Sequence, residues 1–245
     1  MSERQRLDLA LQSRGLMPSR ARARDAILRG TITVNGAVAA KPGQLVGDDD
    51  SIAVDDPAGG YVSRAALKLI AGLDAGGVDP GGAVCLDVGS STGGFTQVLL
   101  ERGAARVYAV DVGHGQLHPS LASDTRVVSL EGVNARDLST TEIPQTIDVL
   151  VSDVSFVSVT KVLEKPLGLC GPAAHAVVLV KPQFEVGREH IGKGGIVSDM
   201  AAITRAAEDV DRFFDRLGWE AVISVPSPIT GGDGNREVVA VYRRL

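Results

Sequence analysis

Apolar runs of five to nine residues alternate with helix-like segments over most of the chain. Seven of these runs follow residue 83: VCLDV, RVYAVDV, RVVSLEG, TIDVLVSDV, HAVVLVK, EAVISV and EVVAVYRRL. This alternation predicts an α/β fold built on a doubly wound parallel sheet. The last two runs are joined by a loop rich in proline and glycine, so we expect them to pair as an antiparallel hairpin at one sheet edge.

The first part of the chain follows a different pattern. Apolar positions at Leu7 and Leu11, and again at Ala26 and Ile27, fit two short helices, while TITVNG and SIAV have strand character around an Asn-Gly turn. The segment DDPAGGYVS, residues 55–63, has no apolar period and is typical of a linker. We therefore expect a small α+β domain over residues 1–58 and an α/β domain over residues 59–245.

The charge is distributed unevenly between these two parts. The chain carries a net charge of −5, yet residues 1–41 contain eight Arg or Lys against three Asp or Glu, so the remainder carries −10. A basic module before an acidic body is typical of an RNA-anchoring domain attached to a domain that does not itself hold phosphates. A solvated helical face is the alternative explanation.

Composition excludes several classes of protein. No run approaches the roughly 20 apolar residues of a membrane span, and the start MSERQRLDLA lacks the apolar core of a signal peptide. We expect a cytoplasmic protein without a membrane partner. Cys85 and Cys170 suggest neither a disulfide framework nor a zinc site, and the four histidines have no metal-ligand spacing. No metal is expected.

The stretch CLDVGSSTGGFTQVLLERGAARVYAVDVG, residues 85–113, predicts a strand, a glycine turn, a helix and a second strand. Such turns usually hold the phosphates of a dinucleotide. Asp87 would repel a pyrophosphate and suits a cationic ligand, such as the ammonium group of S-adenosylmethionine (SAM). Asp111 is spaced to accept hydrogen bonds from ribose hydroxyls, as an acid also does in NAD domains. The turn alone leaves SAM and NAD open.

Two polar residues follow buried strands further along the chain. Lys181 ends HAVVLV and precedes Pro182, and Asp153 ends the neighbouring apolar run, so both side chains are expected at the carboxyl edge of the sheet, where ligands bind. Methyl transfer from a sulfonium needs no metal, but a ribose hydroxyl must be aligned and must lose its proton. A lysine beside a carboxylate can act as the base or as an electrostatic anchor, and the pattern does not separate these roles.

The basic module resembles the S-four RNA-binding fold. The shared features are Arg6-Leu7-Asp8, Gly15, Ser19-Arg20, Gly30, Val34-Asn35-Gly36, Lys41-Pro42 and Asp50-x-Ile52-x-Val54. The resemblance implies that the arginines of the second predicted helix contact RNA phosphates. Such a surface recognises the shape of the RNA rather than its base edges. For the whole chain, the implied RNA contacts are Arg6, Arg14, Arg20, Arg22, Arg24, Lys41, Arg64 and Phe156.

The chain as a whole resembles the TlyA family, which joins an S-four domain to an FtsJ-like methyltransferase domain. The resemblance is carried by Ser63-Arg64-x-x-Leu67-Lys68-Leu69, DVGSSTGGF, AVDVGHGQL, Asn134-Ala135-Arg136, SDVSF, VKPQFEVGRE and Gly234-Asn235-x-Glu237. It implies a seven-stranded Rossmann-like sheet that binds SAM. The implied reaction is 2'-O-methylation of ribosomal RNA, at cytidines of the 23S RNA, with the 16S RNA as a further candidate.

The same resemblance assigns residues to roles. A Lys-Asp-Lys-Glu catalytic set maps onto Lys68, Asp153, Lys181 and Glu237. The implied cofactor contacts are Asp87, Gly89, Ser91, Thr92, Gly93, Gly94, Phe95, Asp111, Val112, Asn134, Ala135 and Asp153. The expected partner is ribosomal RNA or a ribosomal subunit, and no protein partner is indicated.

Three other functions stay open. A non-catalytic RNA-binding ribosome assembly factor could keep the fold, although an intact Lys-Asp-Lys-Glu set argues against it. Members of the family are often labelled haemolysins, but no basic amphipathic helix with a large apolar face supports a membrane-active protein. An NAD-dependent oxidoreductase is the remaining alternative.

Overall fold

The computed structural model describes residues 4–245, which form two compact units, residues up to Gly60 and Tyr61–Leu245. Each unit has its own core of buried apolar side chains. No helix among the described residues is long and apolar enough to cross a membrane.

The N-terminal unit contains two helices and two small sheets. Helices α1 (Leu7–Ser13) and α2 (Arg20–Leu28) pack together, and Ser19 caps α2 by accepting the Arg22 backbone N–H. Strand β2 (Ile32–Val34) lies between β3 (Ala37–Val38) and β5 (Ile52–Val54), and β1 (Gln5–Arg6) pairs with β4 (Leu45–Val46). Asn35 and Gly36 take φ values of 50° and 80° at the β2–β3 turn, as a tight hairpin requires. The sequence predicted these helices and this turn.

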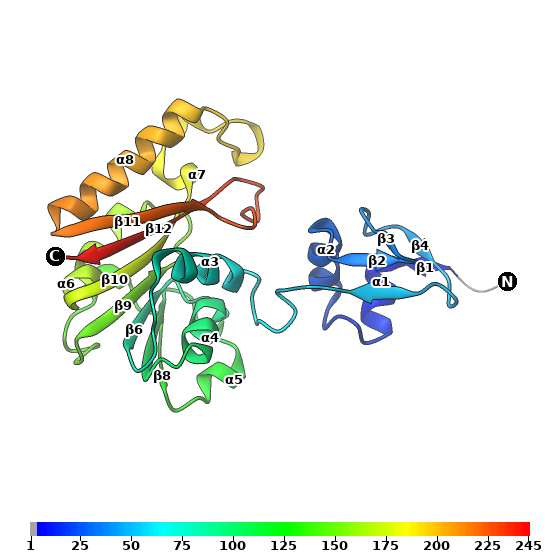
Figure 1. Ribbon diagram of the computed structural model, residues 1–245, viewed down its shortest axis with the longest axis horizontal. Coiled ribbons are helices and arrows are strands. Elements are labelled where there is room, and N and C mark those ends of the chain that lie inside the picture. Colours follow the sequence, from blue (N-terminus) through cyan, green and yellow to red (C-terminus); the bar gives the residue numbers. More distant parts are fainter. Residues whose placement is uncertain (1–3) are drawn as a thin grey trace. The chain divides into compact units, whose positions relative to one another are not determined.

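The second unit is built on a seven-stranded sheet in the order β11-β12-β10-β9-β6-β7-β8 (Figure 1). Its strands are β6 (Val84–Val88), β7 (Arg106–Asp111), β8 (Val127–Glu131), β9 (Ile147–Ser152), β10 (Cys170–Val180), β11 (Trp219–Pro226) and β12 (Val238–Arg244). Strands β10, β9, β6, β7 and β8 are parallel neighbours, and β12 is antiparallel to both β10 and β11. The α/β fold, the seven strands and the edge hairpin are confirmed.

Helices cover both faces of this sheet (Figure 1). Apolar side chains of α3 (Ala66–Gly76), α4 (Gly94–Glu101) and α5 (Pro119–Ala122) join one core cluster, and those of α6 (Glu164–Gly168) and α8 (Met200–Arg216) join the other. The short helix α7 (Pro182–Glu185) directly follows β10. Four 3-10 turns complete the unit: η1 (Ala135–Asp137), η2 (Val159–Lys161), η3 (Arg188–His190) and η4 (Lys193–Gly195).

Helix α3 approaches the sheet closely. A Cβ atom on Gly72 would lie 2.6 Å from Val177 and from Val239, and one on Gly76 would lie 2.7 Å from Val241. Lys68 lies four residues before Gly72 on α3, so it is on the same helix face as the two glycines that pack against the sheet. This spacing places the Lys68 amine at the sheet rather than in solvent.

Candidate active site

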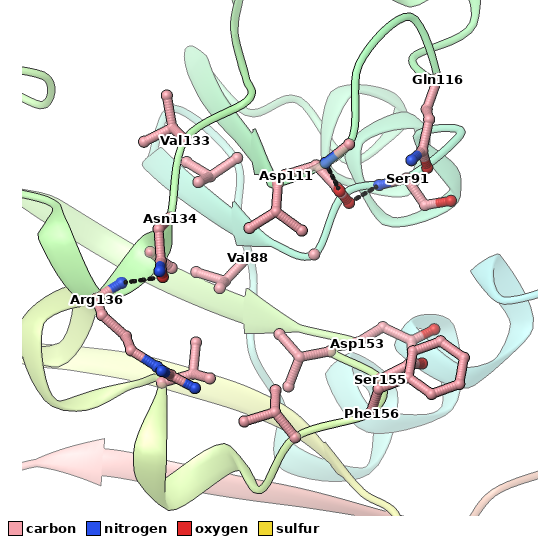
Figure 2. A pocket seen from close by; sticks show the side chains of 18 residues that line it. Val88, Ser91, Asp111, Gln116, Val133, Asn134, Arg136, Asp153, Ser155 and Phe156 are labelled. Atoms are coloured by element: carbon pink, nitrogen blue, oxygen red, sulfur yellow. Dashed lines mark hydrogen bonds between the residues drawn. The ribbon is translucent and has the colours of Figure 1, made fainter.

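A cavity of about 540 Å³ opens at the carboxyl ends of β6, β7 and β9. Ligands of open α/β sheets bind at this edge. Figure 2 shows Asp111 and Ser91 on one side of the cavity and Asp153, Ser155 and Phe156 on the opposite side. A smaller cavity of about 160 Å³ shares Gly89, Ser91, Asp153 and Ser155 with the first and extends along the glycine turn.

The glycine turn is shaped by close backbone contacts. Gly89 takes a φ of 83°, and a Cβ there would lie 3.2 Å from the backbone of Val154, in the loop that follows β9. Gly93 takes a φ of 97°, and a Cβ there would collide with Leu121 of α5. Both positions therefore require glycine, and the turn is held against β9 and α5.

Asp111, at the end of β7, organises the rim of the larger cavity. Its carboxylate accepts the backbone N–H of Ser91 and that of Gly113, both at 2.8 Å (Figure 2). Each oxygen of an ionised carboxylate can accept further hydrogen bonds. Asp111 thus joins the glycine turn to the loop after β7 and still presents acceptors to a ligand.

Glu131, at the end of β8, supports the same loop. Its carboxylate accepts the backbone N–H groups of Gly115, Gln116 and Leu117 at 2.7 to 3.0 Å. These hydrogen bonds hold the pKa of Glu131 below its usual value, with Leu117 the largest contributor. Because Gln116 and Gly113 line the larger cavity, Glu131 positions part of its wall.

Asp87 lies beneath the cavities rather than in their walls. Its carboxyl group is fully buried, and Oδ2 accepts the Thr96 hydroxyl at 2.7 Å, which ties β6 to α4. Its Oδ1 has no hydrogen-bond partner among the described residues. Burial raises the pKa of Asp87 to about 7, against the opposing effect of the Thr96 hydrogen bond. Asp87 lines neither cavity, and its contact with an ammonium group stays a prediction.

Lys181 and Asp153 form an ion pair at the ends of adjacent strands. The Lys181 Nζ lies 2.6 Å from Asp153 Oδ1, and it donates to Ser155 Oγ at 2.7 Å and to the Asp153 carbonyl at 3.4 Å. The Lys181 side chain is only 7% exposed. Asp153 lines both cavities. The pair therefore places a fixed positive charge directly behind the cavity wall.

Lys68 and Glu237 form a second, more deeply buried ion pair. The Lys68 Nζ donates to Glu237 Oε2 at 2.5 Å, and both side chains are at most 7% exposed. Val180 of β10 lies opposite Val238 of β12 in the antiparallel ladder. The next residues, Lys181 and Glu237, therefore stand at the same end of these two strands, and the four predicted catalytic side chains gather at one sheet edge.

Most of the residues predicted to bind the cofactor line the two cavities. Those lining one or both are Gly89, Ser91, Thr92, Gly94, Phe95, Asp111, Val112, Asn134, Ala135 and Asp153. Asp87 and Gly93 line neither. Three further residues of the motifs SDVSF, AVDVGHGQL and Asn134-Ala135-Arg136 also line the larger cavity without having been predicted for the site: Ser155, Gln116 and Arg136. Phe156, predicted to contact RNA, also lines it and is 91% exposed.

The predicted RNA-binding side chains of the N-terminal unit have different surroundings. Arg6 and Arg20 pair with the buried Asp8 at 3.0 and 2.9 Å, and the Arg6 hydrogen bond is the main reason that the pKa of Asp8 falls to about 2. Other members of the predicted set also bond within the unit: Arg14 donates to the Gly47 and Asp50 carbonyls and Arg22 to the Ala58 carbonyl.

Arg24 and Lys41 are exposed, and no ion pair involves either within residues 4–245. They are the members of the predicted set with charge most available to an outside partner. The described residues contain no group of three or more His, Cys, Asp or Glu side chains that could hold a metal ion.

Comparison with known proteins identifies two family matches. The model of the FtsJ-like methyltransferase family matches residues 61–244, and that of the S4 domain matches residues 5–52. The chain is 44% identical to the 16S/23S rRNA (cytidine-2'-O)-methyltransferase TlyA of Mycobacterium tuberculosis, over 97% of this chain and 89% of that protein. It is 40% identical to Hemolysin A of Brachyspira hyodysenteriae, over 97% and 99% of the two chains.

Solved structures show the same architecture. A protein from Streptococcus thermophilus, 34% identical, superposes with a TM-score of 0.77 over all of this chain and 90% of its own. An S-adenosylmethionine-dependent methyltransferase from Mesorhizobium loti shares the fold with a TM-score of 0.54, at 16% identity, over 73% of this chain and 98% of its own.

Proposed function

This chain belongs to the FtsJ-like methyltransferase family, and we propose that it transfers a methyl group from SAM to the ribose 2'-hydroxyl of cytidine in ribosomal RNA. The observation that carries this proposal is the gathering of Lys68, Asp153, Lys181 and Glu237 at the sheet edge beside the larger cavity. The 23S RNA and the 16S RNA are the candidate substrates, because the similar Mycobacterium tuberculosis protein is named for both.

The larger cavity suits SAM in size and in the groups that line it. Its volume of about 540 Å³ lies within the range of sites for ligands of this size. Asp111 would accept hydrogen bonds from the ribose hydroxyls. The side-chain oxygen Oδ1 of Asn134 already accepts the Arg136 backbone N–H (Figure 2). The side-chain nitrogen Nδ2 of Asn134 is therefore the group that would donate to adenine. The glycine turn would border the methionine portion along the smaller cavity.

SAM supplies a methyl group already activated by the sulfonium, so the 2'-oxygen gains the O–C bond as the S–C bond breaks, and S-adenosylhomocysteine and a proton are released. The protein must align the hydroxyl and stabilise the charge that develops on its oxygen. Lys181 is suited to that electrostatic role, because its amine is held directly behind the cavity wall, 2.6 Å from the Asp153 carboxylate that lines the cavity.

The two ion pairs would divide this work. Asp153 lines the cavity and would contact the ribose, and Lys181 stands directly behind it. Lys68 and Glu237 form the more deeply buried pair. The N-terminal unit would hold the RNA through exposed cations such as Arg24 and Lys41. Phe156, exposed at the cavity rim, would meet the nucleotide.

Transfer of labelled methyl from SAM to ribosomal RNA tests the proposal directly. We expect label in nucleotides whose 3'-phosphodiester resists alkaline cleavage, because a methylated 2'-oxygen cannot attack the neighbouring phosphate. The variant Lys181→Met, which should transfer the methyl group far more slowly, is assayed beside the parent protein. Label on bases alone would contradict the proposal, and binding of both SAM and RNA without transfer would favour the assembly-factor alternative.

A further inference from the structure

Three oxygen atoms of the protein lie close to the amine of Lys181, one as an ion-pair partner and two as hydrogen-bond acceptors. An ammonium group has three N–H donors, and three acceptors lie near Nζ: Asp153 Oδ1 at 2.6 Å, Ser155 Oγ at 2.7 Å and the Asp153 carbonyl at 3.4 Å. The carbonyl contact is long for a hydrogen bond. The direction of the amine is therefore set mainly by two side chains, Asp153 and Ser155.

Ser155 differs from Asp153 in its exposure and its charge. It is exposed, it lines both cavities where they share a wall, and its hydroxyl is neutral. When a serine oxygen accepts from a lysine, its own O–H remains able to donate. Ser155 can therefore hold Lys181 on one side and face the incoming ribose on the other.

The loop that carries Ser155 follows a fixed path. Phe156, the next residue, takes a φ of 68°, a conformation that is unfavourable for a bulky residue and persists only where the surroundings impose it. Two residues further on, Glu185 of α7 accepts the Ser158 hydroxyl at 2.6 Å and the Val159 backbone N–H at 2.9 Å. Since α7 directly follows Lys181, the same segment that supplies the amine also anchors the loop that supplies the hydroxyl.

We propose that Ser155 is a positioning residue, which aligns the Lys181 amine with the target 2'-hydroxyl. This inference rests on the proposed function and deepens it. Asp153 holds the amine from one direction, and the Ser155 hydroxyl holds it from a second, so that Nζ is not free to move as the lysine side chain changes rotamer. Without that hydroxyl one N–H loses its partner on the protein and the charge is less well directed.

The test is single-turnover methyl transfer to ribosomal RNA by the full chain, with SAM affinity measured by calorimetry and RNA affinity by filter binding. We expect Ser155→Ala to lower the rate constant roughly tenfold, because the hydrogen bond to a charged group is partly replaced by water at an exposed position. Both affinities should stay within about twofold. Ser155→Thr keeps a hydroxyl and should retain most of the rate. Ser123→Ala changes an exposed serine beyond α5 that lines neither cavity, and it is the matched control.

The outcomes separate this inference from the function on which it rests. An Ala variant as fast as the parent protein would overturn the positioning role, as would a Thr variant as slow as the Ala variant. A fall in SAM affinity large enough to account for the slower rate would also overturn it, since Ser155 would then act through the cofactor. A parent protein that transfers no methyl group to ribose would instead refute the proposed function.

Discussion

Replacing Lys181 by methionine tests the electrostatic role of the ion pair at the cavity wall. Methionine keeps most of the length of a side chain that is only 7% exposed, so the packing of its stem is preserved while the charge is removed. We expect SAM and RNA to bind within a few fold of the parent protein, because Lys181 lines neither cavity. The methyl transfer step should slow strongly.

The magnitude follows from the position of the charge. A unit charge about 4 Å from a developing oxyanion contributes about 4 kcal/mol at an effective dielectric constant of about 20. The Asp153 carboxylate, 2.6 Å from the amine, offsets part of this contribution. About 3 kcal/mol remains, which corresponds to a rate lowered by roughly a hundredfold.

The assay is single-turnover transfer from labelled SAM, with the exposed Lys165→Met as a control that removes the same charge away from the site. Lys181→Arg keeps the positive charge but cannot release a proton, so partial activity is expected if the role is electrostatic. A Lys181→Met variant with near-parental turnover would refute the catalytic assignment. Loss of all activity in the Arg variant, with unchanged folding and binding, would point to general-base action.

Three further predictions concern stability, cofactor binding and RNA binding. Burial raises the pKa of Asp87 to about 7, so folding disfavours its ionised form. The unfolding free energy of the parent protein should therefore fall as pH rises from about 4 to beyond 7. Asp87→Asn should flatten that part of the profile of unfolding free energy against pH. Glu131→Gln removes a carboxylate that binds three backbone N–H groups, and calorimetry should show SAM affinity lower by about 1 kcal/mol. Arg24→Gln should reduce the log-log salt slope of RNA binding by about 0.9 without changing thermal stability, whereas Arg20→Gln should also lower stability because it breaks the ion pair with Asp8.

The sequence predicted the large sheet well because its central strands are rich in apolar residues. Parallel strands are buried on both faces, so their sequences carry a strong local signal, and the strand VCLDV coincides with β6. Polar residues that end such strands, such as Asp153 and Lys181, are conspicuous for the same reason. Their pairing could be expected from strand order alone.

Other contacts depend on packing that leaves little trace in the sequence. Nothing in the glycine turn indicates that Asp87 would be fully buried and bonded to Thr96, because the direction of a side chain at a strand end depends on the helix that follows. Arg6 and Arg20 look like a free basic surface until the fold brings both to Asp8. Lys68, which follows an alanine-rich helix start, likewise looks like a surface charge until α3 packs its Gly72 face against the sheet.

The distribution of paired and unpaired acids along the sheet edge favours SAM over a dinucleotide. Asp153 and Glu237 each have a lysine partner, so the region that would receive the ribose hydroxyl is close to electrically neutral. Asp87 and Asp111 form no ion pair with any Lys or Arg of residues 4–245; their partners are a hydroxyl and backbone N–H groups. A pyrophosphate at the glycine turn would add negative charge beside two uncompensated acids, whereas a ligand with an ammonium and a sulfonium group supplies the positive charge that this side of the site lacks.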